Sequence, residues 1–134
     1  MKLCVVESPY AGEVEKNLEY ARACMKDCLQ RGEAPYASHL LYTQPGVLDD
    51  LVPEQRKLGI EAGFAWRYQA KLVVFYVDLG WSNGMKAALE RLEEENSKTL
   101  SPVEIRFRSL GRPWSATTSE PTDSKLRLDM YDGE

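Results

Sequence analysis

The chain has little of what metal and disulfide chemistry need: one histidine and three cysteines among 134 residues. The cysteines, Cys4, Cys24 and Cys28, form no C-x-x-C pair, whereas a structural zinc site draws four ligands from closely spaced Cys and His residues. We therefore expect no metal site. Cys24 and Cys28 are four residues apart on an expected helix, so they share a face. Burial as small apolar side chains is their expected role, and a redox or metal role is the alternative.

A surplus of positive charge is also absent, because 17 Lys and Arg residues face 21 Asp and Glu residues and leave a net charge of −4. Binding to duplex nucleic acid requires a concentrated basic face, so a small molecule is the expected partner. No apolar run approaches the roughly 18 residues that cross a bilayer. The short apolar stretch at the N-terminus contains Glu7, unlike a cleavable signal. We expect no membrane association and a cytoplasmic location.

Short apolar runs alternate with amphipathic segments along the first 108 residues. The runs predict strands, and apolar residues at three- and four-residue steps predict helices. The expected strands are 2–7, 34–39, 72–77 and 103–108, and the expected helices are 13–31, 53–68 and 85–96. With 43% apolar residues, residues 1–108 are expected to form one domain. The alternation predicts an α/β fold, a three-layer flavodoxin/Rossmann-like sandwich with a four- to five-stranded, mainly parallel sheet in the order 2-1-3-4.

The loop after the third expected strand has the composition of an anion-binding site. Ligands bind beyond the carboxyl ends of parallel strands, so we expect a cleft over the first and third strands. Ser82, Asn83, Gly84 and Met85 begin a helix there, and the free N–H groups of a helix N-terminus favour an anion such as phosphate. The alternative is that Ser82 only caps the helix.

The loop after the first expected strand brings Ser8 and Tyr10 to the same edge of the sheet. A base or sugar fits between the two loops, with Tyr10 stacked on the base or hydrogen-bonded to it. The alternative is that Tyr10 is a half-buried anchor of its loop. His39 follows the second expected strand, and it is either a substrate-binding residue or a structural hydrogen-bonding side chain.

Three carboxylates are candidate catalytic residues: Glu7, Asp78 and Glu61. Glu7 and Asp78 end buried strands, and Asp78 there either bonds a ligand hydroxyl or tethers the following turn. Glu61 lies between Gly59 and Gly63 in an expected helix. Small neighbours permit the close approach of a ligand or another backbone, whereas plain surface exposure is the alternative.

Several motifs resemble the nucleoside 2-deoxyribosyltransferase-like superfamily, which includes deoxynucleoside 5′-monophosphate N-glycosidases and small uncharacterised proteins common in phages and prophages. The resemblance covers about residues 2–108 and is closer to the phage-type branch than to the enzymes. It is carried by S-P-Y-A-G, S-H-L-L-Y-T-Q-P-G-V-L-D-D, R-x-x-G-I-E-A-G and V-V-F-Y-V-D-L-G-W-S-N-G-M. It implies a pocket for base, sugar and phosphate, and a homodimer or higher oligomer in which Trp114 or Tyr131 reaches across the interface.

In the enzymes of this superfamily a glutamate one helical turn past the loop glycine attacks the anomeric carbon, whereas the matching position here is Ala88. The first function implied is still a nucleotide-processing enzyme that cleaves or transfers at the N-glycosidic bond of a (deoxy)nucleoside monophosphate. Its carboxylate then comes from elsewhere in the chain, and it needs no cofactor. The second is a protein that binds a nucleotide without cleaving it. The third is an interaction protein whose irregular tail, 109–134, packs on the domain or on a partner subunit.

Overall fold

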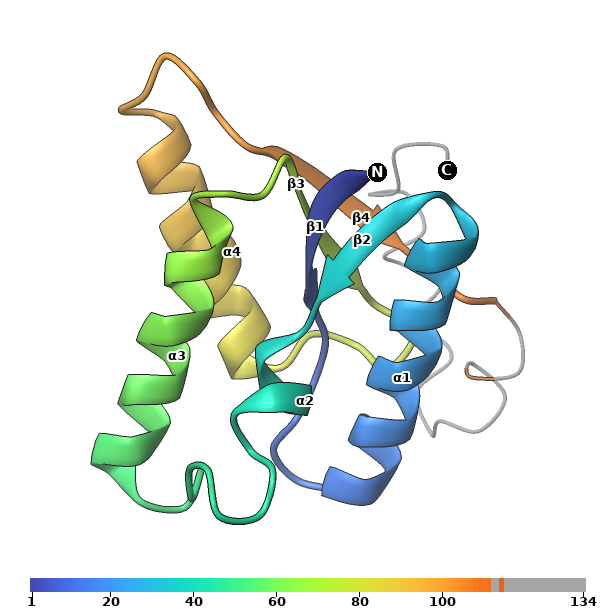
Figure 1. Cartoon of the computed structure of the whole chain (residues 1–134), viewed down its shortest axis with the longest axis vertical. Helices are drawn as coiled ribbons and strands as arrows, with labels where there is room; N and C mark the ends of the chain where they lie inside the picture. The colour runs from blue at the N-terminus through green and yellow to red at the C-terminus, as the bar shows by residue number, and fades with distance from the viewer. Residues whose placement is uncertain (112–113, 115–134) are drawn as a thin grey trace.

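The computed structural model describes residues 1–111 and Trp114, and its strands and helices alternate along the chain (Figure 1). In chain order the elements are β1 (Lys2–Glu7), α1 (Val14–Gln30), β2 (Glu33–Tyr36), α2 (Ser38–Leu41), α3 (Pro53–Arg67), β3 (Leu72–Tyr76), α4 (Asn83–Asn96) and β4 (Glu104–Arg108). Within this described part, no helix combines the length and the apolar character needed to span a membrane.

The four strands form one parallel sheet in the order β2-β1-β3-β4, which confirms the predicted α/β sandwich and its strand order. Strands β1 and β3 lie at the centre, and Val5 of β1 is paired with Tyr36 of β2 and with Val73 of β3. Strand β3 is buried along its whole length, as its run of apolar and aromatic residues predicts for a strand covered on both faces.

Helix α1 covers one face of the sheet, and α3 and α4 cover the other (Figure 1). Because successive strand side chains point to opposite faces, each strand contributes to two apolar clusters. The cluster under α1 contains Cys4, Val6, Tyr20, Cys24, Cys28, Ala37, Leu72, Val74 and Tyr76. The cluster under α3 and α4 contains Val5, Phe64, Val73, Phe75, Val77, Met85, Ala88 and Leu92. Cys24 and Cys28 therefore have the burial that their spacing predicts.

The predicted second strand, 34–39, is wrong at its end. Strand β2 stops at Tyr36, and the chain turns into the short helix α2, which contains His39. The backbone N–H of Tyr42 donates to Ser38 O (2.8 Å), and the Thr43 hydroxyl donates to His39 O (2.5 Å). These local bonds satisfy backbone groups that a longer strand would pair with β1, so His39 lies on a helix turn and not at a strand end.

A buried ion pair joins the two edge strands across the α1-side face of the sheet. Arg108, the last residue of β4, donates from Nη1 and Nη2 to the two carboxylate oxygens of Glu33, the first residue of β2, at 2.8 and 2.7 Å. Arg108 is 2% exposed and Glu33 is 9% exposed. The bidentate geometry compensates for removing both charges from water, and it fixes one corner of the sheet relative to the diagonally opposite corner.

The tail predicted to be irregular, 109–134, falls mostly outside the described residues, and so does Tyr131. Of the tail, the described residues are 109–111 and Trp114. The Trp114 ring packs edge-on against Tyr20 of α1, with ring centroids 5.1 Å apart. Trp114 therefore contributes to the apolar cluster under α1 of its own chain.

We predict that Glu33→Gln destabilises the fold far more than Glu104→Gln. The first change replaces the carboxylate that accepts two hydrogen bonds from the buried Arg108 guanidinium, which costs about 3–5 kcal/mol. The second weakens the pairs that Glu104 forms with Lys2 and Arg106 at the surface, and each such pair contributes about 0–1 kcal/mol. Urea unfolding of both variants measures the two free energies, and equal losses would contradict the structural role of the buried pair.

Candidate functional site

A groove opens at the carboxyl end of β1, between the β1–α1 loop and the segment that connects α2 to α3. Its main cavity has a volume of about 760 Å³, and a smaller one of about 110 Å³ adjoins it. The two cavities share the lining residues Tyr10, Thr43, Leu48, Asp50, Gln55 and Arg56. The main cavity is lined by Tyr10, Ala11, Gly12, Val14, Thr43, Pro45, Gly46, Val47, Leu48, Asp49, Asp50, Leu51, Gln55 and Arg56. The two volumes together are large enough for a drug-sized ligand. We refer to both cavities as the inter-loop groove.

Ser8, Tyr10 and His39 meet at the inner end of this groove. The Ser8 hydroxyl and His39 Nε2 are hydrogen-bonded at 2.8 Å, and the Tyr10 ring meets the imidazole edge-on with centroids 6.1 Å apart. Tyr10 and His39 line the smaller cavity, while Ser8 is buried behind them. The structure thus brings together three predicted substrate-binding residues, although α2 and not the end of a strand positions His39.

His39 is uncharged at neutral pH because burial lowers its pKa to about 4. One ring nitrogen of a neutral imidazole donates a hydrogen bond and the other accepts one. With Nε2 engaged by Ser8, the orientation of the ring is fixed. A half-buried neutral histidine in this position is suited to recognising an uncharged polar group and less suited to binding an anion.

Charged and polar side chains from 49–56 form the outer wall of the groove. Arg56 Nη1 donates to Asp50 Oδ2 at 2.6 Å, and Gln55 Oε1 accepts from the backbone N–H of Asp49 at 2.7 Å. Asp49 and Asp50 end the S-H-L-L-Y-T-Q-P-G-V-L-D-D motif, but the sequence gave no reason to select Gln55 or Arg56. Both lie in the first turn of α3, and their helical position alone resembles an ordinary solvated face.

The two glycines beside Glu61 allow α3 to pack closely against α2 and the following loop. A Cβ atom on Gly63 would lie 3.1 Å from Ser38 Cβ, and one on Gly59 would lie 3.3 Å from Leu48 Cδ1. The two glycines therefore permit the close approach of another part of the chain, and not of a ligand. Glu61 itself points outward and forms a bidentate ion pair with Arg91 of α4 at 3.0 and 3.2 Å.

Glu7 is the candidate acid with the most perturbed surroundings. It is half-buried at the end of β1, on the same face as Val5, and no hydrogen bond to its carboxylate occurs among the described residues. Burial raises its pKa to about 7, and the charge of Arg67 opposes this shift only in part. Both protonation states of Glu7 are therefore populated near neutral pH, as a general acid or base requires.

Asp78 tethers the chain that follows β4. Its carboxylate accepts hydrogen bonds from the Tyr20 hydroxyl (2.6 Å) and the Ser109 hydroxyl (2.5 Å), and from the backbone N–H groups of Leu110 (2.8 Å) and Gly111 (3.1 Å). The Tyr20 oxygen also accepts from the backbone N–H of Asp78 at 2.9 Å. At 1% exposure, Asp78 fits the tethering alternative, except that the tethered turn follows β4 and not β3.

The predicted anion loop lies outside the inter-loop groove. Ser82 Oγ accepts from the backbone N–H of Met85 at 3.1 Å, which is the geometry of a helix N-cap. Ser82, Asn83, Gly84 and Met85 are not among the residues that line the groove, and Met85 is buried in the apolar cluster under α4. Ala88, 6% exposed, belongs to the same cluster. The Ala88 side chain faces the sheet, so this residue contributes to packing and has no catalytic group.

A family model described as a domain of unknown function (DUF7768) matches residues 2–101, so the chain belongs to this family. The match runs from β1 past the end of α4 and includes every residue that lines the groove. No curated protein and no solved structure gives a significant match to the chain.

Glu7 and His39 affect stability with opposite pH dependence. The pKa of His39 falls from 6.5 to about 4 on folding, so its contribution is complete above pH 6.5 and is lost as the pH falls towards 4. The pKa of Glu7 rises from 4.5 to about 7, so its contribution is complete below pH 4.5 and is lost as the pH rises through 7. The two effects oppose each other where the windows overlap.

We predict that Glu7→Gln makes the fold more stable relative to wild type at about pH 8 than at about pH 5. The substitution removes a carboxylate whose ionisation opposes folding, and the relative gain is on the order of 2 kcal/mol. Urea unfolding at both pH values measures it, with Glu90→Gln on the exposed face of α4 as the matched control. Parallel pH profiles for wild type and Glu7→Gln would show that burial does not perturb Glu7.

Proposed function

We propose that this member of the DUF7768 family binds a nucleoside-type ligand, a base with its sugar, in the inter-loop groove without cleaving it. The observation that carries the proposal is the contact of Tyr10 and His39 at the inner end of a groove of about 760 Å³. An aromatic ring supplies a stacking surface for a base, and a neutral imidazole held by Ser8 supplies a directed hydrogen bond.

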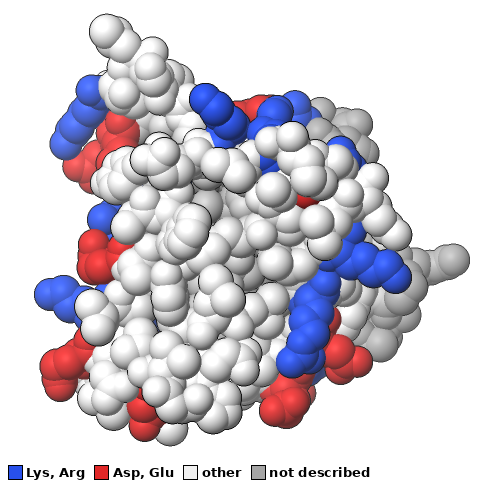
Figure 2. Space-filling model, viewed as in Figure 1, with Lys and Arg blue, Asp and Glu red and all other residues white. Residues whose placement is uncertain are grey.

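The charges around the groove favour an uncharged ligand. Arg56 is the one cationic side chain among its described lining residues, and it is paired with Asp50. Figure 2 shows that the face between α3 and α1 carries few charged side chains. A phosphate would have to displace Asp50 from Arg56 and lie near Asp49, whereas sugar hydroxyls can donate to these carboxylates. A nucleoside therefore fits the groove better than the nucleoside monophosphate implied by the resemblance.

Binding without cleavage is favoured by the positions of the carboxylates. The superfamily nucleophile is replaced by Ala88 in an apolar cluster, Asp78 is engaged by the chain after β4, and Glu61 is paired with Arg91 on the surface. A glycosidase needs a carboxylate next to the scissile bond, and none of the candidate acids Glu7, Asp78 and Glu61 is among the described residues that line the groove. We also propose that the protein acts in the cytoplasm, which holds nucleosides. The proposal includes the homodimer that the resemblance implies.

The first experiment incubates the purified protein with a mixed pool of nucleosides and nucleoside monophosphates. Liquid chromatography with mass spectrometry then measures both the ligand retained by the protein and any free base. Retention of intact nucleosides, with weaker retention of monophosphates, is the expected result. Preferential retention of monophosphates would indicate that the phosphate binds at a surface outside the groove. Retention of neither class of ligand would contradict the proposed function.

We predict that Tyr10→Ala weakens binding of the retained nucleoside about tenfold or more. Stacking of a base on an aromatic side chain contributes about 1–3 kcal/mol, and this energy is lost with the ring. Tyr68→Ala is the matched control, because Tyr68 is 66% exposed and is not among the groove-lining residues. Isothermal titration calorimetry measures both affinities, and equal effects would place the ligand outside the groove.

N-glycosidic cleavage is a second candidate function, and the raised pKa of Glu7 favours it. A carboxyl group with a pKa of about 7 can protonate a leaving base and then accept a proton from water. This function would appear in the pool experiment as free base released over many turnovers.

If base is released, we predict that Glu7→Gln lowers the rate a hundredfold or more at similar affinity. Asp78→Asn should instead lower the melting temperature, because it weakens hydrogen bonds to the chain after β4. Rate and melting temperature measured on both variants separate a catalytic role from a structural one. Normal turnover by Glu7→Gln would exclude Glu7 as the acid.

A further inference from the structure

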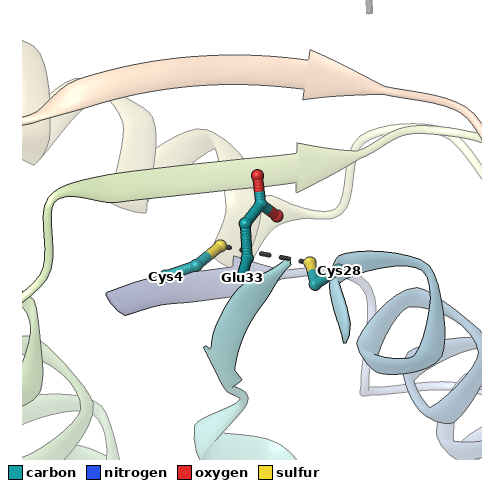
Figure 3. A group of neighbouring side chains, drawn as sticks. All are labelled: Cys4, Cys28 and Glu33. Carbon is teal, nitrogen blue, oxygen red and sulfur yellow. Dashed lines mark hydrogen bonds between the residues drawn. The ribbon is translucent and has the colours of Figure 1, made fainter. Parts of the chain in front are cut away.

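Two buried thiols face each other between β1 and the last full turn of α1. The sulfur atoms of Cys4 and Cys28 are 4.0 Å apart, and Figure 3 shows the two side chains approaching each other beside Glu33. Cys4 is 1% exposed and Cys28 is 0% exposed. Neither residue belongs to the inter-loop groove, which lies at the other end of β1.

These thiols and the Glu33 carboxylate form a donor group in which all three ligand atoms lie within 4.8 Å of one another. A metal ion is nevertheless a poor occupant. Both Glu33 oxygens accept hydrogen bonds from Arg108, and Arg108 Nη1 also lies 3.8 Å from Cys28 Sγ. A cation would have to displace Arg108 from its carboxylate and remain next to a buried guanidinium, so the same positive charge that excludes a metal stabilises a thiolate.

We propose that Cys4 and Cys28 are a redox pair that hydrogen peroxide converts to an intramolecular disulfide linking β1 to α1. Disulfide sulfurs lie about 2.05 Å apart, so the present separation closes by roughly 2 Å. Cysteine side chains can supply such a displacement through rotation about χ1. The pair is poised for the bond without a change in the order of the strands.

The surroundings assign the two sulfurs different roles. Cys28 is the attacking group, because a hydrogen bond from the Cys4 thiol and the nearby charge of Arg108 lower its pKa and outweigh the opposing effect of burial. The hydrogen bond to Cys28 and burial raise the pKa of Cys4, which keeps its proton until the second step. An attacking thiolate beside a resolving thiol is the arrangement that redox-sensitive cysteine pairs use.

The chemistry balances with peroxide as the oxidant. The Cys28 thiolate attacks one oxygen of hydrogen peroxide, the O–O bond breaks, and the departing hydroxide takes up the Cys28 proton to give water and a sulfenic acid. The Cys4 sulfur then attacks Cys28 Sγ, the S–O bond breaks, and the second hydroxide leaves with the Cys4 proton as water. Two thiols lose two electrons, and one peroxide becomes two water molecules.

Access to the pair requires local opening at the end of α1. Cys28 lies in the last turn of the helix, which ends at Gln30 before Gly32 with a φ of 82°. Terminal helix turns open at a lower free energy than the global unfolding of a domain. Peroxide is small enough to enter through such an opening. We therefore expect the two thiols to be oxidised slowly, without global unfolding of the protein.

Cys24 provides an internal control. It lies one helical turn before Cys28, next to Tyr20, and burial raises its pKa. Among the described residues, Cys24 has neither the guanidinium contact nor the facing thiol that distinguishes Cys28. Random oxidation of an unfolded chain would link Cys24 as readily as the other two residues, whereas the native pair excludes it.

The test is to treat the full-length folded protein with hydrogen peroxide, block free thiols and map tryptic peptides without reduction. Trypsin separates the cysteines, because Cys4 lies in 3–16, Cys24 in 23–26 and Cys28 in 27–31. The expected product is a linked pair of the Cys4 and Cys28 peptides that disappears on reduction. The linked monomer should also unfold roughly 5–10 °C higher than the reduced protein.

Variants and conditions make the result decisive. Cys24→Ala should form the same linked pair, and Cys28→Ala should form none. The proposal is overturned if the thiols of the folded wild type stay reduced, or if they oxidise individually without a Cys4–Cys28 link. It is also overturned if links to Cys24 are equally abundant, if the link forms only in urea, or if the link joins two chains.

Discussion

The ion pair between Arg108 and Glu33 is the constraint on which the α1 side of the fold depends. It links the end of β4 to the beginning of β2. The two edge strands are therefore joined directly, across the central strands β1 and β3. The guanidinium also lies 3.4 Å from the Tyr76 hydroxyl, which in turn donates to Asp27 at 2.7 Å. Because a buried charge needs its partners in place, this network holds the last turns of α1 against the sheet except when the helix end opens locally.

The unit formed by β1 and α1 carries both chemical features of the molecule, one at each end. At the carboxyl end of β1, the loop that contains Ser8 and Tyr10 forms one wall of the inter-loop groove. At the other end, Cys4 faces Cys28 beside the Arg108 network. A disulfide there would tie together the strand and helix that hold the groove loop, so the proposed redox chemistry strengthens the scaffold of the proposed ligand site without touching it.

Most of the fold could be predicted from the sequence, whereas the site could be predicted only in part. The apolar run of β3 and the periodicity of α1 reflect the burial of single elements, which depends on residues that are close together in the sequence. The hydrogen bond between Ser8 and His39 joins residues 31 positions apart, and Asp78 accepts from Ser109, also 31 positions away. No spacing rule encodes such contacts. The sequence therefore indicated polar residues near the sheet edge, but not which of them contact one another.

The electrostatics of the groove separate an uncharged interior from a charged rim. His39 is neutral because burial disfavours its protonated form. Ionised side chains remain at the rim, in Asp50 and Arg56, where water screens them. A ligand that inserts an uncharged ring and keeps its polar groups outside loses the least solvation energy on binding. A base on its sugar has this division, and a terminal phosphate directed inward does not.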